Sequence, residues 1–165
     1  MAINPDKCWW TALDKNQSLD LAFTLSKKAL VLWDNFNFQD EIKDKLNAIK
    51  ALPGIALKEI DDVIDKRNES FDEERLTNIF TLFVTPVLQI RDGNLKLPYV
   101  VKSTFLSVFN ILKGILSSND KSNALDCFSL SISRSLDAIT ISNILTSEEI
   151  SKLTQKYFLL SGKNE

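Results

Sequence analysis

Apolar residues recur at steps of three and four along most of this chain, and this spacing constrains the fold more than any other feature. Residues 126–137, DCFSLSISRSLD, show it beside a competing pattern. Phe128, Leu130 and Ile132 alternate with serines, as they would in a strand, but only for six residues. Helical steps persist for fifteen residues, at Leu125, Phe128, Ile132, Leu136 and Ile139. The longer match predicts a helix over about residues 122–140, with its serines facing solvent or a close helical neighbour.

The same spacing predicts further helices, and capping residues, prolines and glycines mark their limits. Side-chain caps are expected at Ser18, Asn37, Ser70 with Glu73, and Thr146 with Glu149. Asn4-Pro5 also resembles a helix start, Pro53-Gly54 a stop and Pro98 a start. The expected helices cover about residues 4–16, 18–35, 37–52, 55–68, 70–88, 98–115, 122–140 and 146–161.

Two places in the fifth of these helices complicate the prediction. Pro86 lies inside the apolar pattern, so we expect a kink or a break near residues 82–86. Residues 88–97 contain Asp92-Gly93 between apolar residues, which is typical of a short β-hairpin. The same pair is also typical of a helix end with Gly93 just past it, and the helical flanks favour this second interpretation.

Composition indicates a single globular domain over residues 1–165. Hydrophobic residues make up 44% of the chain and charged residues 25%. A compact domain of this size buries roughly 70% of its unfolded surface, so it needs no disulfide or metal to fold. With only four glycines and four prolines, no linker divides the sequence. We therefore expect an all-α, single-domain bundle of seven to eight helices.

The chain contains no histidine, and this absence excludes several classes of enzyme. Histidine is the usual general base near neutral pH and the commonest metal ligand. Serine–histidine and cysteine–histidine nucleophiles therefore cannot form within one chain. Cys8 and Cys127 cannot complete a tetrahedral zinc shell, and we expect them to be structural or free thiols. Ser133-Arg134-Ser135 has no general base nearby, so we assign no catalytic residue, metal or cofactor.

Two acidic patterns resemble magnesium-binding motifs. Asp61, Asp62 and Asp65 match the D-D-x-x-D spelling of prenyl synthases, but no second aspartate-rich motif occurs. The pairs Glu41-x-x-Asp44 and Glu59-x-x-Asp62 are similar to the double motif of all-helical nucleotide pyrophosphatases, which implies metal-assisted hydrolysis. Helical spacing places these four carboxylates away from the apolar stripes, so we expect them to face water.

A run of acidic residues between 59 and 74 is the strongest charge feature. Eight acidic residues oppose only Lys66 and Arg67, which gives this segment a net charge of −6 in a chain of net charge −2. Acids near 72–74 also suit a helix N-terminus. The functional interpretation is a docking surface for a basic protein, since such a field speeds encounter and sets specificity. The candidate partner-binding residues are Glu59, Asp61, Asp62, Asp65, Glu69, Asp72, Glu73 and, as an aromatic anchor, Trp10.

Adjacent tryptophans on a helix point about 100° apart, so Trp9 and Trp10 raise the question of exposure. One of them can serve as a binding anchor at a rim, but we favour burial of both in a short helix between two neighbours. The apolar region 95–109, with Leu95, Leu97, Tyr99 and Phe105, makes a homodimer a further expectation.

These observations favour a non-enzymatic, cytoplasmic protein that binds another, basic protein. The concrete version is an immunity-type inhibitor that occludes a basic toxin. The N-terminus lacks the pattern of a signal peptide, and no run of about 18 apolar residues occurs, so we expect no membrane association. The acidic balance argues against nucleic acid. The alternatives are a metal-dependent nucleotide hydrolase and an oligomeric structural or regulatory subunit.

Overall fold

The computed structural model describes residues 8–37, 49–67, 69–117 and 119–162, and these residues form one all-α domain. Within these ranges the chain has six α-helices, one 3-10 helix and no strand. The prediction of seven to eight helices is therefore not supported. The elements are η2 (Trp9–Ala12), α1 (Lys15–Asp34), α3 (Leu52–Asp65), α4 (Glu73–Arg91), α5 (Tyr99–Leu116), α6 (Lys121–Ser142) and α7 (Ser147–Leu160).

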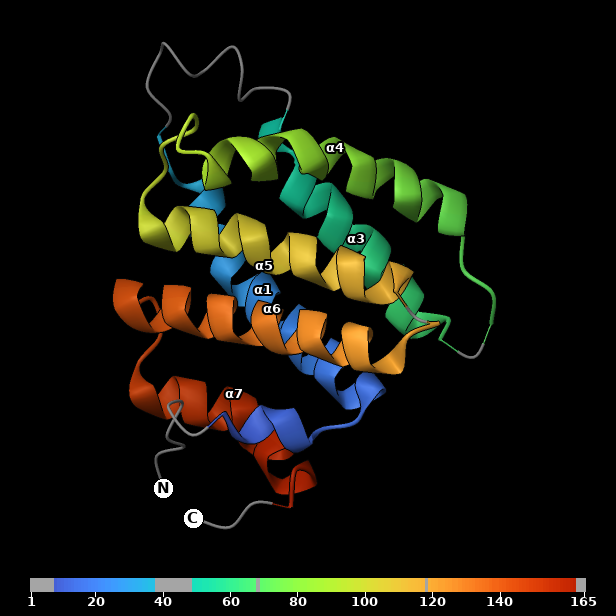
Figure 1. Ribbon diagram of the computed structural model, residues 1–165. Helices are drawn as coiled ribbons and strands as arrows, with labels where there is room; N and C mark the ends of the chain where they lie inside the picture. Colours follow the sequence, from blue (N-terminus) through green and yellow to red (C-terminus); the bar gives the residue numbers. More distant parts are fainter. Residues whose placement is uncertain (1–7, 38–48, 68, 118, 163–165) are drawn as a thin grey trace.

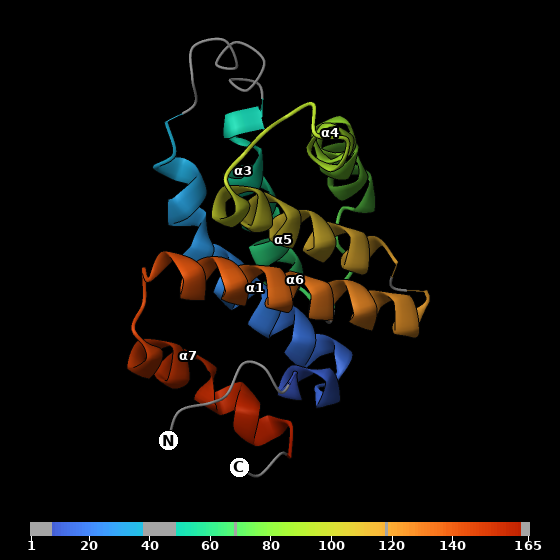
Figure 2. The same ribbon diagram turned by 60° about the vertical axis from the view of Figure 1, so that its left-hand side comes forward.

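Three consecutive helices, α4, α5 and α6, lie side by side with alternating direction (Figure 1). Helices α1 and α3 cross behind them, and α7 with η2 lies beyond α6. The turned view in Figure 2 shows α1 passing behind α5 and α6, with α4 at the far edge from α7. This order places the α3–α4 connection at one end of the bundle and leaves one flank of α4, α5 and α6 open to solvent.

Helix α5 occupies the centre and packs against α1, α3, α4 and α6. It contains no acidic residue, and eleven of its eighteen residues are buried. Of the described helices, α5 has the length and apolar composition that would suffice to cross a membrane. Its place in the core accounts for that composition, since the central helix of a bundle is apolar on most of its surface.

Small residues allow α1, α5 and α6 to approach closely. Ser26 of α1 donates a hydrogen bond to Ser107 of α5 at 3.0 Å, and its hydroxyl lies 3.4 Å from that of Ser131 of α6. All three side chains are completely buried. Ser107 and Ser135 donate in turn to backbone carbonyls of their own helices. Of the four serines in residues 126–137, Ser131 and Ser135 are completely buried, whereas Ser129 and Ser133 are partly exposed. The predicted close helical neighbour is therefore present at Ser131.

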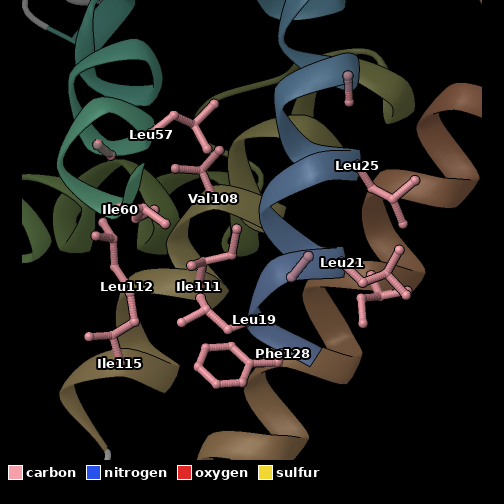
Figure 3. Close-up of a cluster of buried hydrophobic side chains, with 14 of the residues drawn as sticks. Leu19, Leu21, Leu25, Leu57, Ile60, Val108, Ile111, Leu112, Ile115 and Phe128 are labelled. Carbon is pink, nitrogen blue, oxygen red and sulfur yellow. The ribbon is translucent and has the colours of Figure 1, made fainter. Parts of the chain in front are cut away.

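Large side chains fill the space around this contact. Figure 3 shows Leu57 and Ile60 of α3, with Leu19 and Phe128, around the apolar face of α5. Leu21 and Leu25 lie on the opposite side of α1. Aromatic rings join α4 to α5, because Phe80 stacks on Phe109 with ring centroids 5.2 Å apart and Phe83 on Phe105 at 4.7 Å. Such ring pairs contribute about 0.5–1.5 kcal/mol beyond their buried area.

Lys50 closes the C-terminus of α1, a role that the sequence pattern did not reveal. Its ammonium group donates to the carbonyls of Trp33, Asp34 and Phe36, each at 3.1 Å. The Trp33 indole donates to the Lys50 carbonyl at 2.8 Å. A lysine at this position adds a donor to carbonyls at the helix end, and its charge complements the helix dipole. The contact joins the end of α1 to the chain just before α3.

Several predicted helix starts are wrong by a few residues. Asp14, not Ser18, caps α1 in a capping box with Gln17, and Ser18 is buried. Asp72, not Ser70, caps α4 by accepting the Arg75 amide at 3.0 Å. Pro53-Gly54 lies in the first turn of α3, directly after the helical residues Ile49 and Lys50 and the turn at Ala51. Pro98 precedes α5 as expected, and Thr146 with Glu149 forms the predicted capping box of α7.

The predicted helix over 122–140 is confirmed by α6. The predicted third helix over 37–52 lies mostly outside the described residues, as does the start at Asn4-Pro5. Trp9 and Trp10 lie in the 3-10 helix η2, where the sequence predicts an α-helix.

The hairpin alternative at residues 88–97 is wrong. Helix α4 continues to Arg91, and Gly93 follows it with a φ of +77°, a conformation that favours glycine. The Leu95 amide then donates to the Gln89 carbonyl at 3.0 Å. Pro86 does not break α4 either. Leu82, whose carbonyl loses its helical donor at Pro86, is 58% exposed, so water can satisfy that oxygen.

A substitution at Gly114 tests the close approach of α5 and α6. A Cβ added at Gly114 would lie 2.8 Å from Phe128 Cδ1 and 3.0 Å from Cζ, and Phe128 is 1% exposed, so its ring has no free space to enter. We expect Gly114→Ala to lower the free energy of unfolding by about 1–3 kcal/mol because the core is overpacked. Urea denaturation monitored by circular dichroism measures this change.

Gly54→Ala is the matched control. A Cβ added at Gly54, in the first turn of α3, meets no atom within 4 Å. Alanine is the better helix former by about 0.8–1.0 kcal/mol, so this variant should be as stable as the parent or more stable. Equal effects of the two substitutions would contradict the tight contact at Gly114.

Candidate functional site

The exposed acidic residues gather at the end of the bundle where α3 meets α4. They come from the C-terminal half of α3, the connection after it and the start of α4, which lie together at the right of Figure 1. No described basic side chain forms an ion pair with them. We call this set the acidic surface: Asp61, Asp62, Asp65, Glu69, Asp72 and Glu73.

Glu59 does not belong to this exposed set. Its side chain is only 15% exposed, and its carboxylate lies 2.8 Å from the guanidinium of Arg75. The expectation that Glu59 faces water is therefore wrong, because α4 brings Arg75 over it. Glu59, Asp62 and Asp72 line a pocket of about 340 Å³ together with Lys66 and Arg75. Within this pocket, Glu59 joins α3 to α4 and is not available to an incoming protein.

Part of the acidic surface has a structural role. The Asp72 carboxylate caps α4, while Glu73 and Glu74 lie in the first turn of that helix. Anionic side chains at this position stabilise a helix through its dipole by about 0.3–1 kcal/mol each. Asp62, Asp65 and Glu69 have no such role. They are the part of the surface for which the fold offers no structural explanation.

Basic residues border the acidic surface on the α1 side. Arg67 forms an ion pair with Asp20 of α1 at 2.7 Å. Asp61 lines a pocket with Lys27 and Lys58, whereas Asp62 lines the separate pocket beside Arg75. The negative field is therefore centred on the α4 side of α3. The two neighbouring aspartates also point to different sides of the helix.

Trp10 is not exposed. Trp9 and Trp10 are 3% and 4% exposed, as the favoured interpretation predicts. The Trp10 indole donates to the Ser129 hydroxyl of α6 at 3.2 Å, and the Trp9 ring packs edge-on against Phe158 of α7 with centroids 5.4 Å apart. Both rings hold η2 between α6 and α7. Trp10 thus lies apart from the acidic surface and offers no accessible ring to a partner.

The described residues do not form a catalytic arrangement of the kinds that the sequence suggested. They contain no group of three or more acidic or cysteine side chains positioned to hold a metal ion. Asp61 and Asp62 diverge around α3, which separates two members of the D-D-x-x-D pattern. Of the double motif, Glu41 and Asp44 lie outside the described residues. Ser135 is buried and donates to backbone carbonyls.

Two of the apolar residues named for self-association in the region 95–109 do not reach the surface. Leu95 and Phe105 are buried, and Tyr99 is 42% exposed with its hydroxyl donating to Asp137 at 3.1 Å. The homodimer stays a prediction, and it cannot depend on Leu95 or Phe105.

A second surface, of opposite charge, lies on the open flank of α4, α5 and α6. Its floor is apolar, and the space above it measures about 320 Å³. Four basic side chains surround this floor, and no acidic side chain lines it. We call it the cationic groove: Arg91, Lys102, Lys113 and Arg134 around Val87, Ile90, Leu106, Phe109, Asn110 and Leu130.

Sequence reasoning missed this groove because its residues come from three helices. One signal was present. A second set of residues recurs at helical steps beside the buried face of α5: Lys102, Leu106, Phe109 and Lys113. Apolar residues flanked by lysines next to the buried face of a helix are candidates for the wall of a groove. The net charge was a second signal. The chain carries −2 and residues 59–74 carry −6, so the remaining residues carry +4.

Comparison with known proteins adds no family assignment: no family model, curated protein or solved structure matches this chain significantly. The functional argument therefore depends on the two surfaces themselves.

The different reactivity of the two cysteines tests whether the Cys127 side chain is buried. Cys127 is 6% exposed, and burial raises the pKa of its thiol, although nearby Lys113 opposes part of this effect. Cys8 is exposed. Because the thiolate is the reactive form, we expect Cys127 in native protein to react with an aromatic disulfide reagent about tenfold or more slowly than Cys8 at neutral pH. Its rate should keep rising with pH until the pH exceeds the raised pKa.

Cys8→Ser isolates the signal of Cys127, and labelling in urea gives the unfolded control, in which both thiols should react at similar rates. Equally fast labelling of both cysteines in the native protein would show that Cys127 is accessible.

Proposed function

We propose that this chain is a non-enzymatic protein that binds a basic surface of another protein through its acidic surface. The observation that carries the proposal is that Asp62, Asp65 and Glu69 are exposed at one end of the bundle without an ion pair to a described basic side chain. Unpaired carboxylates of one sign raise the rate of encounter with a basic partner and select against acidic ones.

The inhibitor version of this function follows from where the carboxylates lie. The acidic surface extends from the C-terminal half of α3 through the connection to the start of α4, so its charge is spread over an area suited to the surface of another protein. A protein whose own active site is basic, such as a nuclease toxin, presents the complementary field. Binding there would occlude that active site without any chemistry by this chain, and a cytoplasmic setting fits such a role.

The hydrolase alternative gains no support from the described part of the site. Its motif requires Glu59 as a magnesium ligand, but Glu59 is shielded and neutralised by Arg75 at 2.8 Å. A magnesium ion usually binds carboxylates that converge from more than one element, with room for its own water molecules. We therefore do not extend the proposal to metal-assisted hydrolysis.

Charge reversal at the acidic surface tests the proposal directly. The variant changes Asp61, Asp62 and Asp65 to lysine together. All three lie in the C-terminal half of α3, where lysine suits the helix dipole better than aspartate, so the helix should persist. We expect the variant to bind a labelled lysine-rich peptide at least about tenfold more weakly than the parent at an ionic strength of about 0.1 M. Fluorescence anisotropy measures this affinity.

The matched control makes the same change of net charge elsewhere, at Asp34, Asp92 and Asp126, which are exposed and lie off the acidic surface. Its affinity for the peptide should stay within about threefold of the parent, since charges farther than about 10 Å are screened in moderate salt. Two outcomes contradict the proposal: the two triple variants lose affinity equally, or the parent itself fails to bind the peptide.

A further inference from the structure

The cationic groove has the charge distribution of a site for an extended anionic ligand. Arg91 is the last residue of α4 and Lys102 lies in the first turn of α5, so both lie at the end where these two helices connect. Lys113 lies in the last turn of α5, at the opposite end (Figure 1). Eleven residues at about 1.5 Å of rise each separate Lys102 from Lys113 by about 16 Å. Arg134 lies across the groove on α6.

The four basic groups are not used inside the described fold. None of them forms an ion pair with a described carboxylate, and the Lys102 ammonium group lies 5.6 Å from the centroid of the Tyr99 ring. Among the nearby acids, Asp137 accepts the Tyr99 hydroxyl, while Asp92 and Asp126 are exposed and do not line the groove. The groove therefore keeps an uncompensated positive charge in a protein of negative net charge.

Exposed apolar side chains continue the floor beyond the groove. Leu130, on the floor itself, is 46% exposed. Val84 and Leu88 are exposed on α4, three residues before Val87 and Arg91, so helical spacing puts them on the groove side. Ile141 is 58% exposed and lies seven residues after Arg134 on α6. Contiguous exposed apolar patches often mark sites that bind another protein or a ligand.

We propose that the cationic groove binds an acidic amphipathic helix of a partner protein. The apolar face of that helix would cover Leu106, Phe109 and Leu130. Glutamate and aspartate on its flanks would pair with the four basic side chains. About 16 Å corresponds to three helical turns, which is the length over which a helix lying in a groove presents its anchoring residues.

Other anionic ligands fit less well. A single-headed amphiphile would engage one end of the groove and leave the cation at the other end unpaired. The acidic surface of a second copy supplies carboxylates but no exposed large apolar side chain between the described residues 59 and 74, so the floor would stay uncovered. Nucleic acid would also meet repulsion from the acidic surface, and the floor is mainly aliphatic, with one aromatic ring, Phe109, for a base to stack on.

The test uses a labelled synthetic peptide of about four helical turns, with leucines on one face and glutamates on the others. A scrambled peptide of the same composition, which has no apolar face, is the control ligand. We expect the full chain to bind the amphipathic peptide about tenfold or more tightly than the scrambled one. Only the amphipathic peptide can cover the apolar floor and at the same time pair with the four basic side chains, which we call the rim. Fluorescence anisotropy at physiological ionic strength measures both affinities.

Two variants separate the rim from the floor. Arg91→Gln with Lys113→Gln removes one cation from each end, and both residues are exposed. Leu130→Gln removes the half-exposed part of the floor. Each should weaken binding of the amphipathic peptide by about tenfold. The controls are Lys58→Gln with Lys121→Gln for the rim and Leu159→Gln, 68% exposed on α7, for the floor. The controls should leave the affinity unchanged, and circular dichroism verifies that all variants fold.

Three results would overturn the proposal. The first is that the scrambled peptide binds as tightly as the amphipathic one, because the groove would then be a nonspecific cationic patch. The second is that a single-stranded RNA of equal charge binds more tightly than the peptide and that Leu130→Gln does not change the affinity for this RNA. The groove would then be a nucleic-acid site. The third is that the parent binds none of these ligands at physiological ionic strength, because the groove would then not be a binding site for extended anions.

Discussion

The close contact of α1, α5 and α6 is the constraint on which the other features of this fold depend. Three buried serines replace the large side chains that would hold these helices apart, and their hydroxyl groups satisfy one another and nearby carbonyls. Gly114 extends the contact by giving the Phe128 ring its space. Because α5 is held from both sides in this way, α3 and α4 can pack on its remaining faces and receive a defined position.

That position determines the two charged surfaces. Packing α3 beside α4 shields Glu59 under Arg75, and it leaves the carboxylates that follow Glu59 at the end of the bundle. Packing α4 and α6 on either side of α5 brings Arg91 and Arg134 to the two lysines of α5 around one apolar floor. The two surfaces lie on different parts of the molecule and have opposite charge. Under the two proposals, one protein would engage a basic partner and an acidic partner on separate surfaces, and salt would weaken both contacts.

Sequence periodicity predicted the elements whose apolar stripe is long, and it failed where several polar residues compete for one role. Helix α6 was predicted despite its alternating serines, because the helical pattern outlasts the alternation. The cap of α1 was missed since Ser18 and Asp14 both resemble caps, and only packing shows that Ser18 is buried. The acidic surface was predictable because it is nearly continuous in sequence. The cationic groove was not, because its walls lie more than forty residues apart, from Val87 to Arg134.

Native-state hydrogen exchange tests the central contact most directly. If the small-residue contact holds α1, α5 and α6 as one unit, their buried amides should be the slowest to exchange, and they should share one opening free energy equal to that of global unfolding. Amides of α7 and of the C-terminal turns of α4 should open at lower free energies. Exchange of α5 amides well before those of α1 and α6 would contradict the account, because it would show that the central helix opens without its neighbours.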